Sequence, residues 1–161
     1  LTQAVDTGVD GLIIVDLPPE EDEELCLPAQ EHGLPFIRLT APTSDDERLP
    51  TILENASGFI YYVSIMGITG TQSIATQNVQ NAVKKLKKHT ELPIAVGFGI
   101  KTRQDVAEVT SFSDAAVVGS AVVSVIEQSL DANGEGSDKT IADALALVRD
   151  LAAGVRDKKI A

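Results

Sequence analysis

The chain has 161 residues, is 43% hydrophobic and 23% charged, and carries a formal net charge of −11. This composition is typical of a globular protein with a sizeable core and unlike that of a disordered chain. The negative charge disfavours nucleic acid and anionic membranes as partners, because both bind clustered cations. The sequence contains one cysteine, Cys26, which excludes an internal disulfide framework.

Apolar, largely β-branched runs alternate with helical patterns along the whole chain. The apolar residues in these runs are continuous, which is typical of parallel strands covered on both faces. The five predicted strands are residues 11–15, 35–39, 59–63, 93–96 and 115–118.

Proline and glycine punctuate the first predicted helix. Pro18 and Pro19 suit the first turn of a helix, where a missing N–H costs nothing. Pro28 predicts a kink or an early break, and Gly33 predicts the end of this helix.

Two later helices have capping signals. Ser44 with Glu47, and Thr102 with Asp105, show the spacing of a capping box. Amphipathic stripes mark two long helices, with apolar residues recurring on one face. The stripes are Val79, Ala82, Val83 and Leu86, then Ile141, Leu145, Val148 and Val155.

Five successive strand–helix units predict an α/β fold that is a (β/α) barrel or most of one. A complete barrel needs eight such units. A doubly wound open sheet is the competing arrangement.

Glycine-rich turns follow three of the predicted strands. They are Gly67-Ile68-Thr69-Gly70, Gly97-Phe98-Gly99-Ile100 and Gly119-Ser120-Ala121. In α/β barrels the functional site lies where strands end, and phosphate binds backbone N–H groups after the last strands. The combination predicts binding of a phosphorylated small molecule.

Other polar residues have two interpretations each. Asp16 could act at a strand end, but an N-cap for the helix near Pro18 is favoured. Tyr61 could line the barrel mouth, although filling the core is favoured. Thr69 could bind a ligand or serve as an ordinary turn residue. No acid/base pair and no metal-ligand spacing is visible.

Several of these stretches together resemble the α subunit of tryptophan synthase. They are Asp16-Leu17-Pro18-Pro19-Glu20-Glu21, residues 61–70 and Gly97-Phe98-Gly99-Ile100, completed by Gly119-Ser120-Ala121. They occur in the family's order and spacing, and the resemblance covers nearly all of the chain.

The resemblance implies a TIM (β/α)8 barrel, of which residues 1–161 supply strands four to eight with their helices as a single partial domain. The implied reaction is retro-aldol cleavage of indole-3-glycerol phosphate to indole and glyceraldehyde 3-phosphate, a carbon–carbon lyase step of tryptophan biosynthesis. The implied partner is a β subunit that carries pyridoxal phosphate, within a heterotetramer. No cofactor is expected in this chain itself.

Matching motifs imply roles for particular residues. Tyr61 would line the site, and Thr69 would hydrogen-bond the catalytic aspartate. Asp16 and Pro18 would face the β subunit. The groups implied to bind the phosphate are those of Gly70, Phe98, Gly99, Gly119 and Ser120. The family's two catalytic carboxylates precede the region that this chain matches, so the segment alone is expected to be inactive.

Two other interpretations stay open. The chain could belong to another phosphate-binding barrel enzyme, or it could be a non-catalytic partial barrel that binds phosphate. A cytoplasmic location is expected, and a plastid location stays open because the sequence begins with Leu1 instead of methionine.

Overall fold

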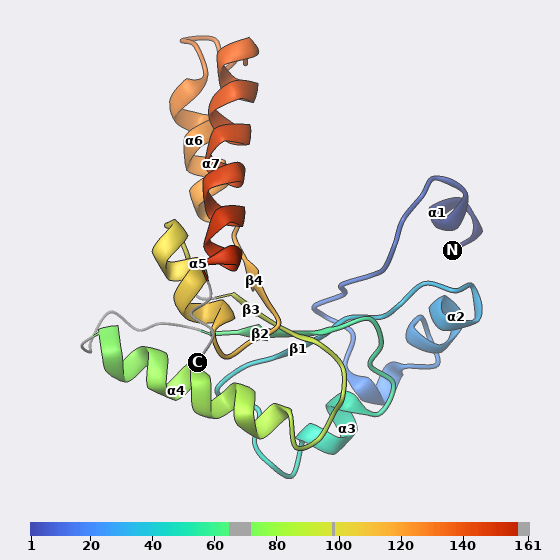
Figure 1. Cartoon of the computed structure of the whole chain (residues 1–161). Helices are drawn as coiled ribbons and strands as arrows, with labels where there is room; N and C mark the ends of the chain where they lie inside the picture. Colours follow the sequence, from blue (N-terminus) through green and yellow to red (C-terminus); the bar gives the residue numbers. More distant parts are fainter. Residues whose placement is uncertain (65–71, 98, 158–161) are drawn as a thin grey trace. The chain divides into compact units, whose positions relative to one another are not determined.

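The computed structural model describes residues 1–64, 72–97 and 99–157 (Figure 1). The chain divides into two compact units, Leu1–Val96 and Gly97–Ala161. Each unit is described by itself below. The sequence-based prediction of a single domain stays a prediction.

Four strands form one sheet, and their order in the sheet is their order in the chain. They are β1 (Arg38–Thr40), β2 (Ile60–Val63), β3 (Ile94–Gly97) and β4 (Ala115–Val117). β1 and β2 are parallel, with Leu39 opposite Tyr61. A doubly wound sheet reverses its strand order at a switch point, and these four strands show no reversal. The α/β prediction is confirmed, and the barrel type is favoured over the open sheet.

The first predicted strand, residues 11–15, is wrong. Leu12 forms a single parallel bridge with Phe36, in which the Leu12 N–H donates to the Pro35 carbonyl at 2.8 Å. Pro35 has no N–H to extend the ladder. Val15 is 73% exposed, so the apolar run lacks a packed neighbour on one side.

The helical segments of the first unit lie before β1 or between its strands. They are α1 (Thr2–Asp6), the 3-10 turn η1 (Pro19–Glu21), α2 (Cys26–Glu31), α3 (Leu49–Leu53) and α4 (Gln72–Leu86). Pro28 lies in the first turn of α2, so the chain breaks before the proline and has no kink at it. Gly33 follows α2 with φ +77°, which confirms the predicted helix end.

The capping box predicted at Ser44 is wrong. The Ser44 hydroxyl accepts the Ala41 N–H at 3.1 Å, and the Asp45 carboxylate accepts the Arg48 N–H at 2.8 Å. These bonds close a turn, and α3 begins later, after Arg48, without a side-chain cap.

Two faces of the first unit's sheet differ in burial. Arg38, Thr40, Ile60 and Tyr62 are buried, whereas Leu39 and Tyr61 on the opposite face are half-buried. α4 contributes Val79, Val83 and Leu86 to the core, which confirms its predicted stripe. A second cluster joins Cys26, Ala29, Leu34 and Phe36.

The second unit contains α5 (Arg103–Thr110), β4, α6 (Ser120–Ser129) and α7 (Asp138–Arg156). α7 packs against both α5 and α6 (Figure 1). Gly154 permits the close approach to α5, because a β-carbon there would clash with the carbonyl oxygen of Arg103. Within the described residues, no helix has both the length and the apolar character needed to cross a membrane.

The capping box predicted on α5 is confirmed. Thr102 Oγ1 accepts the Asp105 N–H at 3.1 Å, and Asp105 Oδ2 accepts the Thr102 N–H at 2.9 Å. Partial burial raises the pKa of Asp105, but hydrogen bonds from the N–H groups of Lys101 and Thr102 outweigh it and hold the pKa below its ordinary value.

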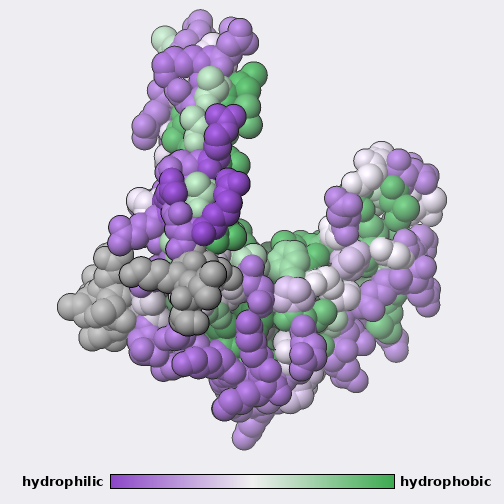
Figure 2. All heavy atoms as spheres, in the orientation of Figure 1, coloured by the Kyte–Doolittle hydropathy of each residue, from purple (hydrophilic) through white to green (hydrophobic). Residues whose placement is uncertain are grey.

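The stripe predicted on α7 is present but faces solvent. The exposed fractions of its members are 61% for Ile141, 55% for Leu145, and 46% for both Val148 and Val155. Figure 2 shows hydrophobic surface among the polar residues of this unit. A contiguous apolar face of this kind favours association.

The capping box on α5 makes stability depend on pH. Because the folded-state pKa of Asp105 is lowered, its contribution is complete above the ordinary value of 3.8 and is lost as the pH falls through the folded pKa. We expect Asp105→Ala to destabilise the protein by about 1 kcal/mol at neutral pH. Its acid denaturation curve should be flatter as the pH falls from about 3.8 through the folded pKa of Asp105. Urea unfolding at several pH values measures the loss of stability and its pH dependence.

The control for Asp105→Ala is Glu108→Ala, which removes an exposed carboxylate from the same helix. An unchanged pH slope in Asp105→Ala would contradict the assignment.

The exposed stripe predicts that the 161-residue chain self-associates. Leu145→Lys places a cation in the stripe and should shift sedimentation toward the monomer, because burial of an unpaired charge is costly. Ala146→Lys, on another side of α7, should not. A wild-type chain that sediments as a monomer at every concentration would refute this prediction.

Candidate functional site

The start of α6 presents backbone donors. Its N-cap is Gly119, which provides no side-chain cap. The N–H groups of Val122 and Val123 both donate to the Gly119 carbonyl, at 3.0 and 3.2 Å. The N–H groups of Ser120 and Ala121 precede these first intrahelical bonds, at the positive end of the helix dipole. Such an end suits an anion.

The space in front of this helix end is open. Gly119 and Ser120 are exposed, and a β-carbon on Gly119 would meet no atom within 4 Å. Glycine here is therefore not required by packing against the protein. A ligand is free to approach the main chain closely.

Gly99 lies in the turn that follows β3. Its φ of +58° is in the left-handed region, which favours glycine. The residue is exposed, and a β-carbon there would also meet nothing within 4 Å. The predicted site residues Phe98, Thr69 and Gly70 lie outside the described residues.

Tyr61 lies on the half-buried face of the sheet, beside Leu39 in the register of β1 and β2. The neighbouring Tyr62 points to the other face, where burial raises the pKa of its phenol. Tyr61 therefore occupies the less covered face, and its contact with a ligand stays a prediction.

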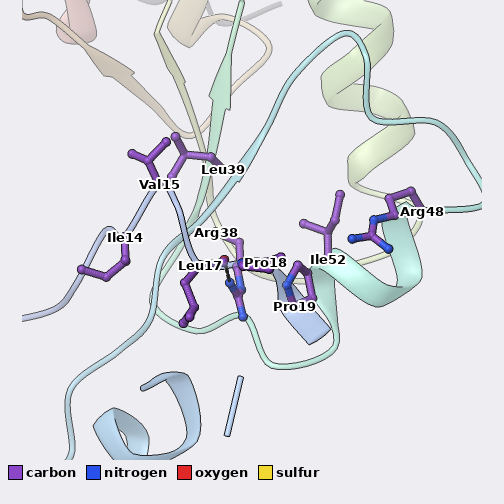
Figure 3. Close-up of a pocket in the computed structure, with 9 residues that line it drawn as sticks. All are labelled: Ile14, Val15, Leu17, Pro18, Pro19, Arg38, Leu39, Arg48 and Ile52. Carbon is purple, nitrogen blue, oxygen red and sulfur yellow. Dashed lines mark hydrogen bonds between the residues drawn. The ribbon is translucent and has the colours of Figure 1, made fainter. Parts of the chain in front are cut away.

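A cavity of about 190 Å³ lies in the first unit (Figure 3). Its wall is largely apolar, with two arginines. The lining residues are Ile14, Val15, Leu17, Pro18, Pro19, Arg38, Leu39, Arg48 and Ile52. Pro18, predicted to face a partner, belongs to this wall and is exposed.

Asp16 is exposed and does not cap the following turn. The N-cap of η1 is Pro18, without a side-chain hydrogen bond. The favoured interpretation of Asp16 as an N-cap is therefore wrong. Proline at 18 and 19 sets the backbone angles of this turn without help from a carboxylate.

Two ion pairs lie near the cavity. Arg48 forms a two-pronged, exposed pair with Glu20, and its hydrogen bond lowers the pKa of the Glu20 carboxyl. Arg38 pairs with Asp22, and both side chains are buried. Burial lowers the pKa of the Arg38 guanidinium.

The Arg38–Asp22 pair was missed from the sequence, although a signal was present. Arg38 interrupts the apolar run Pro35-Phe36-Ile37, and a charged residue in a buried strand requires a partner. The partner comes from a distant segment that the sequence pattern does not identify.

Metal chemistry has no visible donor set in the described part of the chain. Within residues 1–64, 72–97 and 99–157, no three His, Cys, Asp or Glu side chains gather as a metal site would require.

A sheet whose strands follow chain order, with a helix after each strand, defines an α/β protein of the barrel type. Sequence comparison narrows the class. The family described as "Tryptophan synthase alpha chain" matches residues 1–156. This chain therefore belongs to the tryptophan synthase alpha chain family.

Solved structures agree with this assignment. The tryptophan synthase alpha chain of Legionella pneumophila is 33% identical with a TM-score of 0.80, covering 99% of this chain and 56% of its own. A tryptophan synthase structure from M. tuberculosis is 31% identical with a TM-score of 0.79, and the match covers 96% of this chain and 54% of that one. The tryptophan synthase alpha subunit of Campylobacter jejuni is 29% identical with a TM-score of 0.79, and the match covers 93% of this chain and 56% of that one. The chain thus spans just over half the length of these proteins.

Proposed function

We propose that this chain forms the phosphate-binding part of a tryptophan synthase alpha subunit, which cleaves indole-3-glycerol phosphate to indole and glyceraldehyde 3-phosphate. The observation that carries the proposal is the uncapped start of α6 at Gly119 and Ser120, in a chain that matches the family over residues 1–156. Open main-chain amides at a helix N-terminus suit a phosphoryl group.

The proposed phosphate site combines this helix end with the turn at Gly99. Gly70 and Phe98 complete the set by matching motif. Gly99 supports the proposal because its positive φ fixes a turn with open space in front of it. The phosphate would anchor the substrate, so that the reacting bond is held in one place.

Tyr61 and Thr69 are further proposed residues of the substrate site. Tyr61 supports this role by lying on the half-buried sheet face. Thr69 would orient the catalytic aspartate by matching motif. The cleavage breaks the bond between the indole ring and the glycerol side chain. It needs one group to protonate the ring carbon and another to take the hydroxyl proton. We assign neither group to this chain.

The proposed partner is the β subunit that carries pyridoxal phosphate. Asp16 and Pro18 would face it, since both are exposed and Pro18 borders the cavity. This role in amino-acid biosynthesis is consistent with a cytoplasmic location.

A ligand survey tests the substrate class. We expect the chain to bind indole-3-propanol phosphate more tightly than inorganic phosphate or indole alone in calorimetric titration, because both halves of the ligand find contacts. We also expect no indole release from the 161-residue chain. Robust turnover would show that an acid/base pair was missed. Binding of other sugar phosphates but not of the indole compound would favour another barrel enzyme.

Gly119→Ala tests the phosphate contact directly. The added β-carbon meets no protein atom within 4 Å, so the melting temperature should hardly change. It would intrude on the anion and weaken indole-3-propanol phosphate binding about tenfold or more, the effect of losing a hydrogen bond to a charged group.

The matched control for this variant is Gly136→Ala, whose β-carbon makes ordinary contacts with Thr140 and Leu130. It should bind the ligand as the wild type does. Equal affinities of Gly119→Ala and the wild type for indole-3-propanol phosphate would show that the start of α6 does not bind the phosphate.

A further inference from the structure

The buried pair Arg38–Asp22 belongs to a longer polar network in the first unit. Arg38 is 4% exposed and Asp22 is 5% exposed. The Asn55 amide donates to Asp22 Oδ2 at 2.9 Å, and the Gln30 amide donates to the Asn55 carbonyl at 2.7 Å. The network thus joins α2, β1 and the segment before β2.

The same arginine reaches the segment that borders the cavity. Arg38 Nη1 donates to the Leu17 carbonyl at 3.0 Å (Figure 3). Its guanidinium carbon lies 4.6 Å from the centre of the Phe36 ring, which supports the cation from one side. Arg38 therefore pairs with Asp22 and contacts the Phe36 ring while it donates a hydrogen bond to the main chain at Leu17.

The Leu17 segment has few backbone donors of its own. Pro18 and Pro19 have no N–H, so neither can tie this turn to a neighbouring strand. The side chain of Arg38, in β1, connects this segment to the sheet instead. Because Asp16 and Pro18 flank Leu17, the bond to the Leu17 carbonyl fixes how both are presented.

Stability alone does not explain this arrangement. Apolar residues of similar volume often replace a buried ion pair without loss of stability. Arg38 Nε also has no hydrogen-bond partner among the described residues, which adds to the cost of burial. A buried arginine with these costs is better explained by what it holds in place.

We propose that Arg38 is a positioning residue for partner binding: it holds the Asp16–Pro18 segment in the shape that the β subunit recognises. This inference rests on the proposed function, because that function supplies the partner. Arg38 itself, being buried, does not touch the partner.

The test is the double variant Arg38→Met/Asp22→Leu. Removing both charges together leaves no unpaired buried ion, so the fold should persist. We expect affinity for the β subunit to fall about tenfold or more in calorimetric titration. Hydrogen exchange should rise at the Glu21 and Asp22 amides, which donate to the Pro18 and Pro19 carbonyls, and stay unchanged elsewhere. Affinity for indole-3-propanol phosphate, measured by the same titration, should not change.

The matched control is Arg103→Met/Asp157→Leu, which removes an exposed arginine–aspartate pair from the other unit. It should bind the β subunit normally. Should the double variant fail to fold, Asn55→Ala gives a milder test, since it removes one bond to Asp22. It should raise exchange at the Glu21 and Asp22 amides and weaken partner binding.

Outcomes separate the two proposals. A wild-type protein that does not bind the β subunit would overturn the proposed function. A wild type that binds, with variants that bind equally well and exchange equally slowly, would overturn the role of Arg38 and leave the proposed function standing.

Discussion

Parallel strands cannot be joined by a tight hairpin, and this constraint organises the molecule. After each strand the chain must return along a crossover before it can pair again. Each strand is therefore followed by a loop at its carboxyl end, and a helix begins soon after that loop. The open turn at Gly99 and the uncapped start of α6 both arise in this way. Function in such folds follows from what these loops contain.

The two sides of the sheet have different tasks. In the first unit, Ile60 and Tyr62 point to the fully covered side, whereas Tyr61 and Leu39 occupy the half-covered side. Arg38 lies on the covered side, where a cation survives only with a partner. Its neutralisation by Asp22 couples the interior of the unit to an exposed segment around Leu17. The packing of the interior and the conformation of this exposed segment are thus not independent here.

The sequence predicted this architecture well where the signal was local. β2, β3, β4 and the capping box at Thr102 depend on nearby residues, and all were confirmed. The strand predicted at residues 11–15 is not formed because a strand needs a neighbouring strand along its whole length, and only Leu12 makes a bridge. The capping box predicted at Ser44 failed because a serine hydroxyl can bond to either of two nearby backbone groups. Here it closes a turn at Ala41 instead of capping a helix. The network around Arg38 was missed because Asp22 and Asn55 meet it only after folding. The helix end at Ser120 has the open form expected from its glycine, while Thr69, Gly70 and Phe98 stay predictions.

Cys26 provides a built-in reporter on this interior. Its thiol is fully buried, donates to the Asn55 carbonyl at 3.5 Å and packs with Phe36 in one cluster. Burial raises the pKa of the thiol, although a hydrogen bond from Gln30 acts in the opposite direction. Both the inaccessibility and the scarcity of thiolate protect the sulfur from alkylating reagents. Its rate of labelling therefore measures how often α2 separates from the cluster around Phe36, without any probe being added to the sequence.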